Sequence, residues 1–352
     1  MALTNKISSI KNNTNKYPVY SSQTLNNGLL GYYHQFLFAN GITWTTDGAN
    51  AGTTKYREGQ FYCTNVCGVL SSQEGYANAC MAEIINKETP KHVSYVGNPK
   101  LMSNVVSKIS IILPPLSEQQ AIASVLSDFD EHIDNLTELI EKKKAIRDGA
   151  LNDLVSGKAR LDGFDKEVRE YKPIKSVYKR VKGTPITAGT MNEINMSTGA
   201  IRVFAGGNTE CRTNSDYLSN ANIIREPIVI VQSRGVIDFI YCDEPCTFKN
   251  EMWGYTSLGV SDVRFLFYYL KHNIEHFRNE GTGRSSFSQI SLPVTEEYLI
   301  PVVSMKEQKE IVEILTAMDE EIESLKIEKE KMVQIKEGAM DDLLTGRVRL
   351  KV

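Results

Sequence analysis

The chain has little histidine and cysteine and no long apolar run. Only 5 His and 6 Cys occur among its 352 residues. Five histidines leave little scope for general-base chemistry. Nowhere do roughly 18 apolar residues follow one another, so we expect neither a signal peptide nor a membrane-spanning helix, and a cytoplasmic location.

The six cysteines are too sparse to form a disulfide framework in a chain of this length. Cys63/Cys67 and Cys242/Cys246 repeat a Cys-x-x-x-Cys spacing, but no neighbouring His or second pair completes four metal ligands. The sequence therefore predicts reduced thiols packed within strands and no metal site.

Familiar catalytic motifs are also missing. Gly281-Thr-Gly-Arg-Ser-Ser lacks the Lys of a phosphate-binding loop, and neither G-x-S-x-G nor H-E-x-x-H occurs. Leu113 precedes Pro114-Pro115, so the Asn-Pro-Pro-aromatic signature of amino-methyltransferases is absent. The charged runs beginning at Glu141 and Glu328 are typical of solvated helix faces. We expect no catalytic residue and no cofactor in this chain.

What the chain does contain is a repeat. Glu118–Leu161 returns without a gap as Glu307–Leu350, so that Ile122 aligns with Ile311 and Gly157 with Gly346. Different sequence lies between the copies. This organisation predicts a pseudo-two-fold spacer that carries two separate recognition regions.

Apolar residues in both copies recur at intervals of four and three, the heptad seam of a coiled coil. Because a pseudo-dyad relating the two halves reverses direction, we expect the helices to pair antiparallel. The alternative is that each seam packs only against its own domain. The seam residues are Ile122, Leu126, Phe129, Ile133, Leu136 and Ile140 in the first copy and Ile311, Leu315, Met318, Ile322 and Leu325 in the second.

Each predicted helix has start and stop signals. Ser117 with Gln120, and Ser304 with Glu307, fit capping boxes, while Gly157 and Gly346 fit C-cap glycines. About 38 residues between these signals predict helices roughly 57 Å long.

The two intervening regions are predicted to be β-rich. Short β-branched or aromatic runs separated by Asn/Gly/Ser clusters predict strands at 17–21, 42–45, 60–63, 201–205, 227–232 and 236–241, and Val263–Phe277 has helical periodicity. YPVYSSQT and FYCTNVCGV in the first region resemble IRVFAGGN and CTFKNEMWGY in the second. The second region has about 40 residues before its first matching strand and the first has only Met1–Lys16, so we expect the first region to lack an amino-terminal portion.

Charge and polar loops favour nucleic acid as the ligand of these regions. The chain has net charge −3, with −3 in each helical segment (113–161 and 301–352), +4 over residues 1–112 and −1 over residues 162–300, so the intervening regions are less acidic than the helices. Polar turn residues can contact bases or phosphates, although Gly, Ser and Asn are common in all turns. The candidate DNA-contacting residues are Ser22, Gln23, Thr45, Asn50, Lys55, Lys100, Gly207, Asn208, Arg212, Ser233, Arg234, Lys249, Arg284, Ser285 and Ser286.

The helical segments resemble those of a known family. The pattern L/I-P-P-x-S-E-Q, followed by D-x-x-I-x-x-L and G-A-x-x-D-L-x-x-G-x-x-R-L, occurs at Leu113–Leu161 and less strictly at Ile300–Leu350. It is similar to the conserved regions of type I restriction-modification specificity (S) subunits. The segments TWTTDGANAGT, around Trp44, and GRSSFSQISLPV, at 283–294, resemble that family's target recognition domains.

The resemblance implies an α/β (α+β) fold with two β-rich target recognition domains, at 1–112 and 162–300, separated by an antiparallel coiled coil formed by 113–161 and 301–352. It implies a non-catalytic subunit that reads a bipartite sequence in double-stranded DNA. Its partners would be two methyltransferase subunits and, in the full complex, two restriction-translocase subunits, which would carry S-adenosylmethionine and ATP. The alternatives are an S-like subunit of a type IIB enzyme and a coiled-coil scaffold that does not bind DNA.

Overall fold

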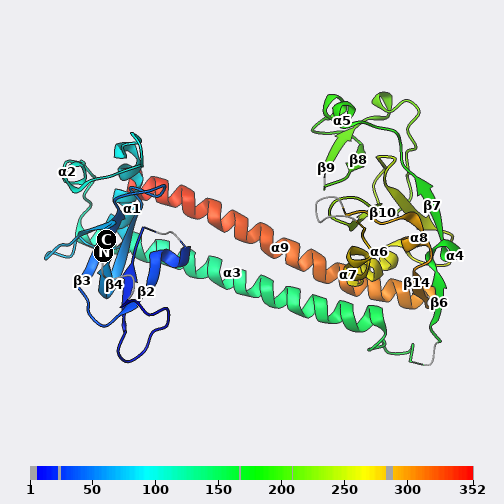
Figure 1. The fold of residues 1–352 in the computed structure, drawn as a ribbon, viewed down its shortest axis with the longest axis horizontal. Coiled ribbons are helices and arrows are strands. Elements are labelled where there is room, and N and C mark those ends of the chain that lie inside the picture. The colour runs from blue at the N-terminus through cyan, green and yellow to red at the C-terminus, as the bar shows by residue number, and fades with distance from the viewer. Residues whose placement is uncertain (1–5, 23–24, 166–167, 208, 283–287, 352) are drawn as a thin grey trace. The chain divides into compact units, whose positions relative to one another are not determined.

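The computed structural model describes residues 6–22, 25–165, 168–207, 209–282 and 288–351. It contains two compact units: unit 1 comprises residues 1–137 and 327–352, and unit 2 comprises residues 138–326. Two long helices, α3 (Leu116–Ser156) and α9 (Met305–Leu344), each contribute one half to each unit (Figure 1). The predicted domain boundaries assign each helix to a segment of its own, and they stay a prediction.

Unit 1 is built on one five-stranded sheet in the order β2-β1-β4-β3-β5. Its strands are β1 (Tyr17–Tyr20), β2 (Leu29–Tyr33), β3 (Phe38–Thr45), β4 (Thr54–Cys63) and β5 (Cys67–Leu70). Its short helices are η2 (Leu25–Gly28), α1 (Ala79–Glu88), η3 (Thr89–His92) and α2 (Ser103–Val106). Helix α1 buries Met81, Ile84 and Ile85 in a core shared with Ile42 of β3.

Unit 2 has a four-stranded sheet, β11-β10-β13-β7, a three-stranded sheet, β12-β8-β9, and the pair β14-β6. Its strands are β6 (Glu170–Pro173), β7 (Tyr178–Lys182), β8 (Ile201–Ala205), β9 (Thr209–Thr213), β10 (Ile228–Gln232), β11 (Asp238–Cys242), β12 (Cys246–Phe248), β13 (Trp253–Ser257) and β14 (Leu299–Val302). Its helices are α4 (Ile174–Val177), α5 (Ala188–Ile194), η4 (Ser215–Tyr217), α6 (Val263–His272), α7 (Ile274–Asn279) and α8 (Leu292–Glu296).

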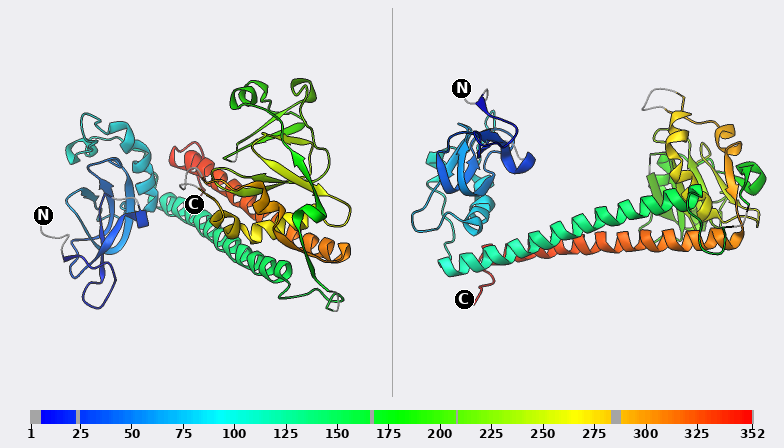
Figure 2. Two further views of the ribbon diagram at one scale, coloured as in Figure 1. Left: turned by 45° about the vertical axis from the view of Figure 1, so that its right-hand side comes forward. Right: turned by 90° about the horizontal axis from the view of Figure 1, so that it is seen from below.

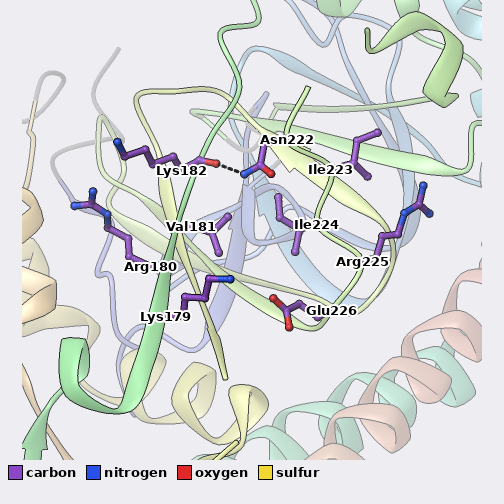
Figure 3. A pocket seen from close by; sticks show the side chains of 9 residues that line it. All are labelled: Lys179, Arg180, Val181, Lys182, Asn222, Ile223, Ile224, Arg225 and Glu226. Carbon is purple, nitrogen blue, oxygen red and sulfur yellow. Dashed lines mark hydrogen bonds between the residues drawn. The ribbon is translucent and has the colours of Figure 1, made fainter. Parts of the chain in front are cut away.

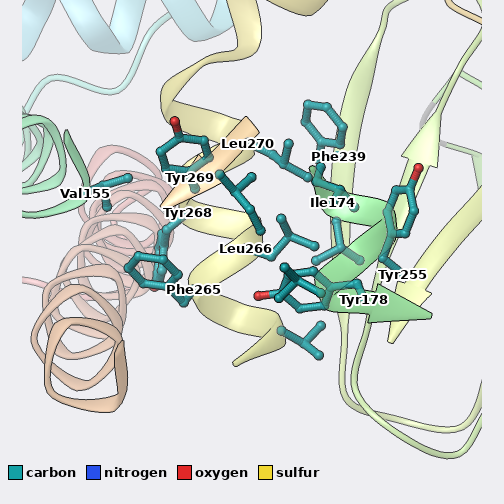
Figure 4. Packing of buried hydrophobic residues seen from close by; sticks show 14 of the residues in the cluster. Val155, Ile174, Tyr178, Phe239, Tyr255, Phe265, Leu266, Tyr268, Tyr269 and Leu270 are labelled. Atoms are coloured by element: carbon teal, nitrogen blue, oxygen red, sulfur yellow. The ribbon is translucent and has the colours of Figure 1, made fainter. Parts of the chain in front are cut away.

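The core of unit 2 lies on both faces of β10, which explains the continuous apolar sequence of that strand. Val229 and Val231 face one cluster, whereas Ile228 and Ile230 face another. Figure 4 shows α6 between the sheet, on the side of Tyr255, and the long helix that carries Val155. The sheet and the helices thus share one apolar core.

The two β-rich regions share a strand arrangement. In unit 1, β1 pairs with β2 antiparallel and with β4 parallel; in unit 2, β8 pairs in the same way with β9 and β12. The antiparallel pairs β3–β4 and β3–β5 recur as β10–β11 and β10–β13. Long β4 therefore corresponds to both β11 and β12, and the predicted resemblance between the regions is confirmed.

Unit 2 has strands that have no counterpart in the described part of unit 1. Strand β7 covers the outer edge of β13, whereas β5, which corresponds to β13, is an edge strand. Ile300–Val302 of β14 pairs with β6, but the corresponding Ile111, Ile112 and Leu113 lie exposed outside any described strand. The two folds therefore differ in β6 and β7, which precede the matching strands, and in β14, which pairs with β6.

The long helices run antiparallel in both units. In unit 1, Glu118 pairs with Arg349 and Asp130 with Lys336. In unit 2, Arg147 pairs with Asp319 and Arg160 with Glu307. As the residue number rises along one chain segment it falls along the other, and Figure 2 shows the opposite directions of α3 and α9. The predicted fold class and antiparallel coiled coil are confirmed.

The predicted seam faces inward along both helices. Its buried members are Ile122, Leu126, Leu136, Ile140, Ile311, Leu315 and Ile322, and its half-buried members are Phe129, Ile133, Met318 and Leu325. Ile122 packs in one cluster with α1 and with Leu343 of α9. Seam residues therefore contact both the partner helix and their own β-rich region, so the two interpretations left open by the sequence hold together.

The helix ends correct one prediction. Helix α3 begins at Leu116, and the Gln119 N–H donates to the Pro115 carbonyl at 2.9 Å, so the capping box assigned to Ser117 is wrong. Ser304 does cap α9, because its Oγ accepts from the Glu307 N–H at 3.3 Å. The predicted stops are confirmed: Gly157 and Gly346 have φ of +80° and +72°, which favour glycine.

Two other predicted elements need correction. Val263–Phe277 is not one helix, because Asn273 (φ −98°, ψ 20°) separates α6 from α7. The strand predicted at 236–241 begins at Asp238, since the Val236 carbonyl accepts a hydrogen bond from the Gln232 amide. Side-chain hydrogen bonds of this kind shift element boundaries.

All six cysteines are free. Five of them belong to strands, as predicted, whereas Cys80 lies in α1. Burial raises the pKa of Cys63 to about 12 and that of Cys80 to about 11. Over the described ranges, no cluster of His, Cys, Asp or Glu is arranged to hold a metal ion. None of the helices in those ranges is long and apolar enough to cross a bilayer.

The repeated ion pairs give a stability prediction. The Glu307 side chain is 0% exposed and Arg160 is 16% exposed, whereas Arg349 is 62% exposed. Glu307→Gln removes the buried negative charge that both Arg160 and Arg169 contact, and it should lower the free energy of unfolding by about 3 kcal/mol. Glu118→Gln, the matched control at the equivalent position, should cost less because water can solvate Arg349. Urea unfolding of both variants measures this, and equal losses would contradict it.

The ion pair between Glu118 and Arg349 predicts that stability depends on pH. The hydrogen bond from Arg349 lowers the pKa of the Glu118 carboxyl below its usual 4.5. A lowered folded-state pKa stabilises the protein above the unfolded-state value, and this contribution is lost as the pH falls through the folded-state pKa.

Candidate nucleic-acid interface

Unit 1 gathers polar side chains around a narrow cleft of about 20 Å³ where β1, β3 and β4 meet. It is lined by Ser21, Gly28, Thr43, Trp44, Thr45, Thr53, Lys55, Arg57 and Cys67. Lys55 Nζ donates to Asn27 Oδ1 at 2.7 Å. Thr45 and Lys55, both predicted from the sequence, are thus brought together.

Arg57 is the central cation of this cleft, and the sequence analysis missed it. It is 6% exposed, and its guanidinium lies 3.8 Å from the centre of the Tyr20 ring. Its Nε donates to Thr43 Oγ1 at 3.1 Å and its Nη1 to the Asn27 carbonyl at 2.7 Å. Burial lowers the pKa of the guanidinium. Arg57 therefore holds the segment containing Asn27 against the sheet, and no pattern in the local sequence indicates this.

The remaining predicted residues of unit 1 lie on neighbouring loops. Lys100 is exposed, with Nζ 3.6 Å from Asp47 Oδ1, and the Asn50 carbonyl accepts from the Thr53 N–H. Ser22 is half-buried after β1, and Gln23 lies outside the described residues. The Trp44 indole donates to the Leu101 carbonyl, which joins the Lys100 loop to the cleft strand.

In unit 2, several predicted residues are engaged within the fold. Arg212 binds both carboxylate oxygens of Glu244, at 2.9 and 3.1 Å. Ser233 is buried and donates to the Glu251 carbonyl. Lys249 pairs with Glu251 at 2.7 Å. These contacts position the loops and occupy the groups that the sequence suggested for DNA.

Two predicted positions of unit 2 are open to solvent. Gly207 is exposed in the β8–β9 turn with φ of +73°. Arg234 is exposed after β10, and within the described ranges its side chain forms no ion pair. Asn208, Arg284, Ser285 and Ser286 lie outside the described residues. Arg234 is therefore the predicted cation best placed to contact an external anion.

The structure also shows a basic cleft that was not predicted. Four cations line a hollow of about 560 Å³: Lys179, Arg180 and Lys182 of β7 and Arg225 of the segment before β10 (Figure 3). The local signal was the run Tyr-Lys-Arg-Val-Lys at 178–182. Arg225 could not have been joined to it from spacing, because about 40 residues lie between them.

Comparison with known proteins agrees with this architecture. The family model described as the type I restriction modification DNA specificity domain matches residues 4–145 and again 166–334. The two matches cover most of the chain, one for each β-rich region. The chain therefore belongs to the family of type I restriction-modification specificity subunits.

Individual relatives support the assignment. S.MpnORF507P of Mycoplasma pneumoniae, described as a type I specificity subunit, is 32% identical over 312 residues, covering 86% of this chain and 81% of the relative. The crystal structure of the S subunit from M. genitalium has a TM-score of 0.63 at 18% identity, covering 98% of this chain and 91% of that one. A chain from a structural study of complex assembly in the type I system has a TM-score of 0.57 at 13% identity, covering 93% and 91%. At these identities the solved structures show a shared fold.

Arg57 supplies a test of the unit 1 cleft. Arg57→Met removes two charge-assisted hydrogen bonds and the contact with Tyr20, so we expect a loss of about 2 kcal/mol in unfolding free energy. Lys91→Met is the control, because Lys91 lies on the surface in an i,i+3 pair with Glu88. Chemical denaturation compares the two, and an Arg57→Met variant as stable as wild type would show that the cation does not hold the cleft together.

Proposed function

We propose that this chain is the DNA-reading subunit of a type I restriction-modification complex and recognises a bipartite target with its two β-rich regions. The observation that carries the proposal is the repetition of one strand arrangement beside equivalent parts of the helix repeat. Unit 1 contains the start of α3 and the end of α9, and unit 2 contains the end of α3 and the start of α9. Two related but divergent regions suit two different half-sites.

The length of the helices supports a target with a gap. Helix α3 has 41 residues. At 1.5 Å per residue it is about 60 Å long, which corresponds to between one and two turns of duplex. Half-sites separated by unread base pairs fit such a ruler.

The subunit would have no chemistry of its own in this proposal. Two methyltransferase subunits would dock on the helices and bring S-adenosylmethionine, and two restriction-translocase subunits would bring ATP in the full complex. The exposed apolar Ile146, Ile327 and Ile335 on the helices offer contact area for such partners. The complex would act in the cytoplasm, where the DNA is.

Salt dependence of DNA binding tests the proposal. The complex of this chain with its methyltransferase subunits should bind duplex DNA with an affinity that falls steeply as salt is added, because phosphate contacts release counterions. Methylome sequencing of cells carrying the system should show one bipartite modified sequence. A scaffold that binds only proteins would show neither, and turnover by the isolated chain would contradict a non-catalytic subunit.

Arg234 provides a residue-level test. Arg234→Ala should weaken binding to the target by about tenfold, with the loss confined to one half-site, because a bidentate Arg contact contributes about 1–3 kcal/mol of discrimination. Arg278→Ala is the control, since Arg278 pairs with Glu275 within α7. Binding constants for the target and for targets altered in one half-site measure the effect. An equal loss on unrelated DNA would rule out base reading by Arg234.

A further inference from the structure

The basic cleft of unit 2 is formed by two segments held in fixed positions. One wall is β7, and the other is residues 222–226. The Asn222 side chain donates to the Lys182 carbonyl at 2.8 Å, and the Asn222 N–H donates to Thr184 Oγ1 at 2.9 Å. Ile224 is buried and is joined to Cys246 by backbone hydrogen bonds. The cleft is therefore part of the folded framework.

Most of its positive charge is not neutralised by the protein. Lys179, Lys182 and Arg225 are exposed, and none of them forms an ion pair over the described ranges. Arg180 forms an ion pair with Glu296, with 3.4 Å between Nη1 and Oε1. Glu226 is the single acidic residue in the lining of the cleft. Other cations of unit 2, such as Lys172, Lys175 and Arg278, do form ion pairs with carboxylates of the protein. Three unpaired cations beside one hollow indicate an anionic ligand.

The cleft is continuous with the loops assigned to DNA. Lys182 lies opposite Trp253, which in turn lies opposite Val231. Ser233 and Arg234 follow two and three residues after Val231. The Lys182 end of β7 and the Arg234 loop therefore occupy the same end of the four-stranded sheet. A ligand seated on that loop end can extend along β7.

The described part of unit 1 offers no equivalent. Strand β5, which corresponds to β13, has no strand such as β7 on its outer edge. Lys55 and Arg57 of β4 are bound to Asn27. The two regions should therefore differ in how they hold a polyanion.

We propose that the cleft lined by Lys179, Lys182 and Arg225 binds the sugar-phosphate backbone of duplex DNA beside the half-site read by unit 2. This inference rests on the proposed function and adds a site to it: phosphates are held along β7, and bases are read at the adjoining loop end. Five strand residues extend about 16 Å, enough for several successive phosphates. Unit 2 accordingly holds the DNA backbone along β7.

The experiment uses the full chain in complex with its methyltransferase subunits. The triple variant Lys179→Ala/Lys182→Ala/Arg225→Ala is compared with Lys172→Ala/Lys175→Ala/Arg278→Ala, which removes the same residue types from the same unit. The probes are a labelled duplex carrying the target found by methylome sequencing and a duplex of random sequence. Binding is measured over a range of salt concentrations, and phosphate ethylation interference maps the contacts. Melting temperatures equal to wild type confirm that both variants are folded.

The cleft variant should bind both probes about ten- to a hundredfold more weakly at low salt. The slope of log affinity against log salt should decrease by about two to three, since each lost phosphate contact removes about 0.9. Ethylation interference should disappear on one side of the target only, and the control variant should match wild type.

Each other outcome overturns the inference in a distinguishable way. A cleft variant with the salt slope of the control would show that the cleft holds no phosphates, and the proposed function would stand. Unchanged DNA affinity with loss of methyltransferase subunits in native mass spectrometry would identify the cleft as a protein-docking surface. A wild-type complex that binds neither probe would remove the proposed function itself.

Discussion

The structure depends on a buried carboxylate at the start of each long helix that pairs with an arginine beyond the end of the other helix. Glu307 is contacted by Arg160 through two hydrogen bonds, at 2.8 and 2.9 Å, and Glu118 is contacted by Arg349 in the same way. An ionised carboxylate removed from water must be paired. Because both arginines follow the helix ends, parallel helices would take both of them away from these carboxylates. The repeat therefore specifies the antiparallel arrangement chemically as well as through its apolar seam.

The residue after each glutamate joins the helix to its β-rich region. The Gln119 amide donates to the Pro114 carbonyl, and its oxygen accepts from Asn78, the N-cap of α1. Gln308 repeats this with the Val303 carbonyl and with the N–H of Asp262, the N-cap of α6. A side-chain oxygen at an N-cap fixes the first turn of a helix. One Glu-Gln pair thus ties a helix start both to the partner helix and to the domain core.

Periodic and backbone-driven features could be predicted from the sequence. The heptad seam and the C-terminal glycines follow from spacing and from a positive φ, and strands such as β8 follow from apolar runs. The burial, hydrogen bonds and ion pairs of individual polar residues could not be predicted. Ser233 and Thr45 are buried, and Arg212 is bound to Glu244, because pairing across strands decides which side chains face inward. Local sequence shows what a side chain can do, but not whether a partner already occupies it.

This division also explains why the two regions can diverge while the helices stay alike. The start of α3 is constrained twice, because Glu118 contacts Arg349 beyond the end of the other helix and Gln119 contacts Asn78 of its own domain. A loop position such as Arg234 is constrained by the sheet beneath it only through the backbone, and its exposed side chain contributes little to stability. Substitutions in the loops can therefore change the exposed side chains without altering the framework. The contacts that fix the two long helices do not involve the exposed loop side chains, which are therefore free to change.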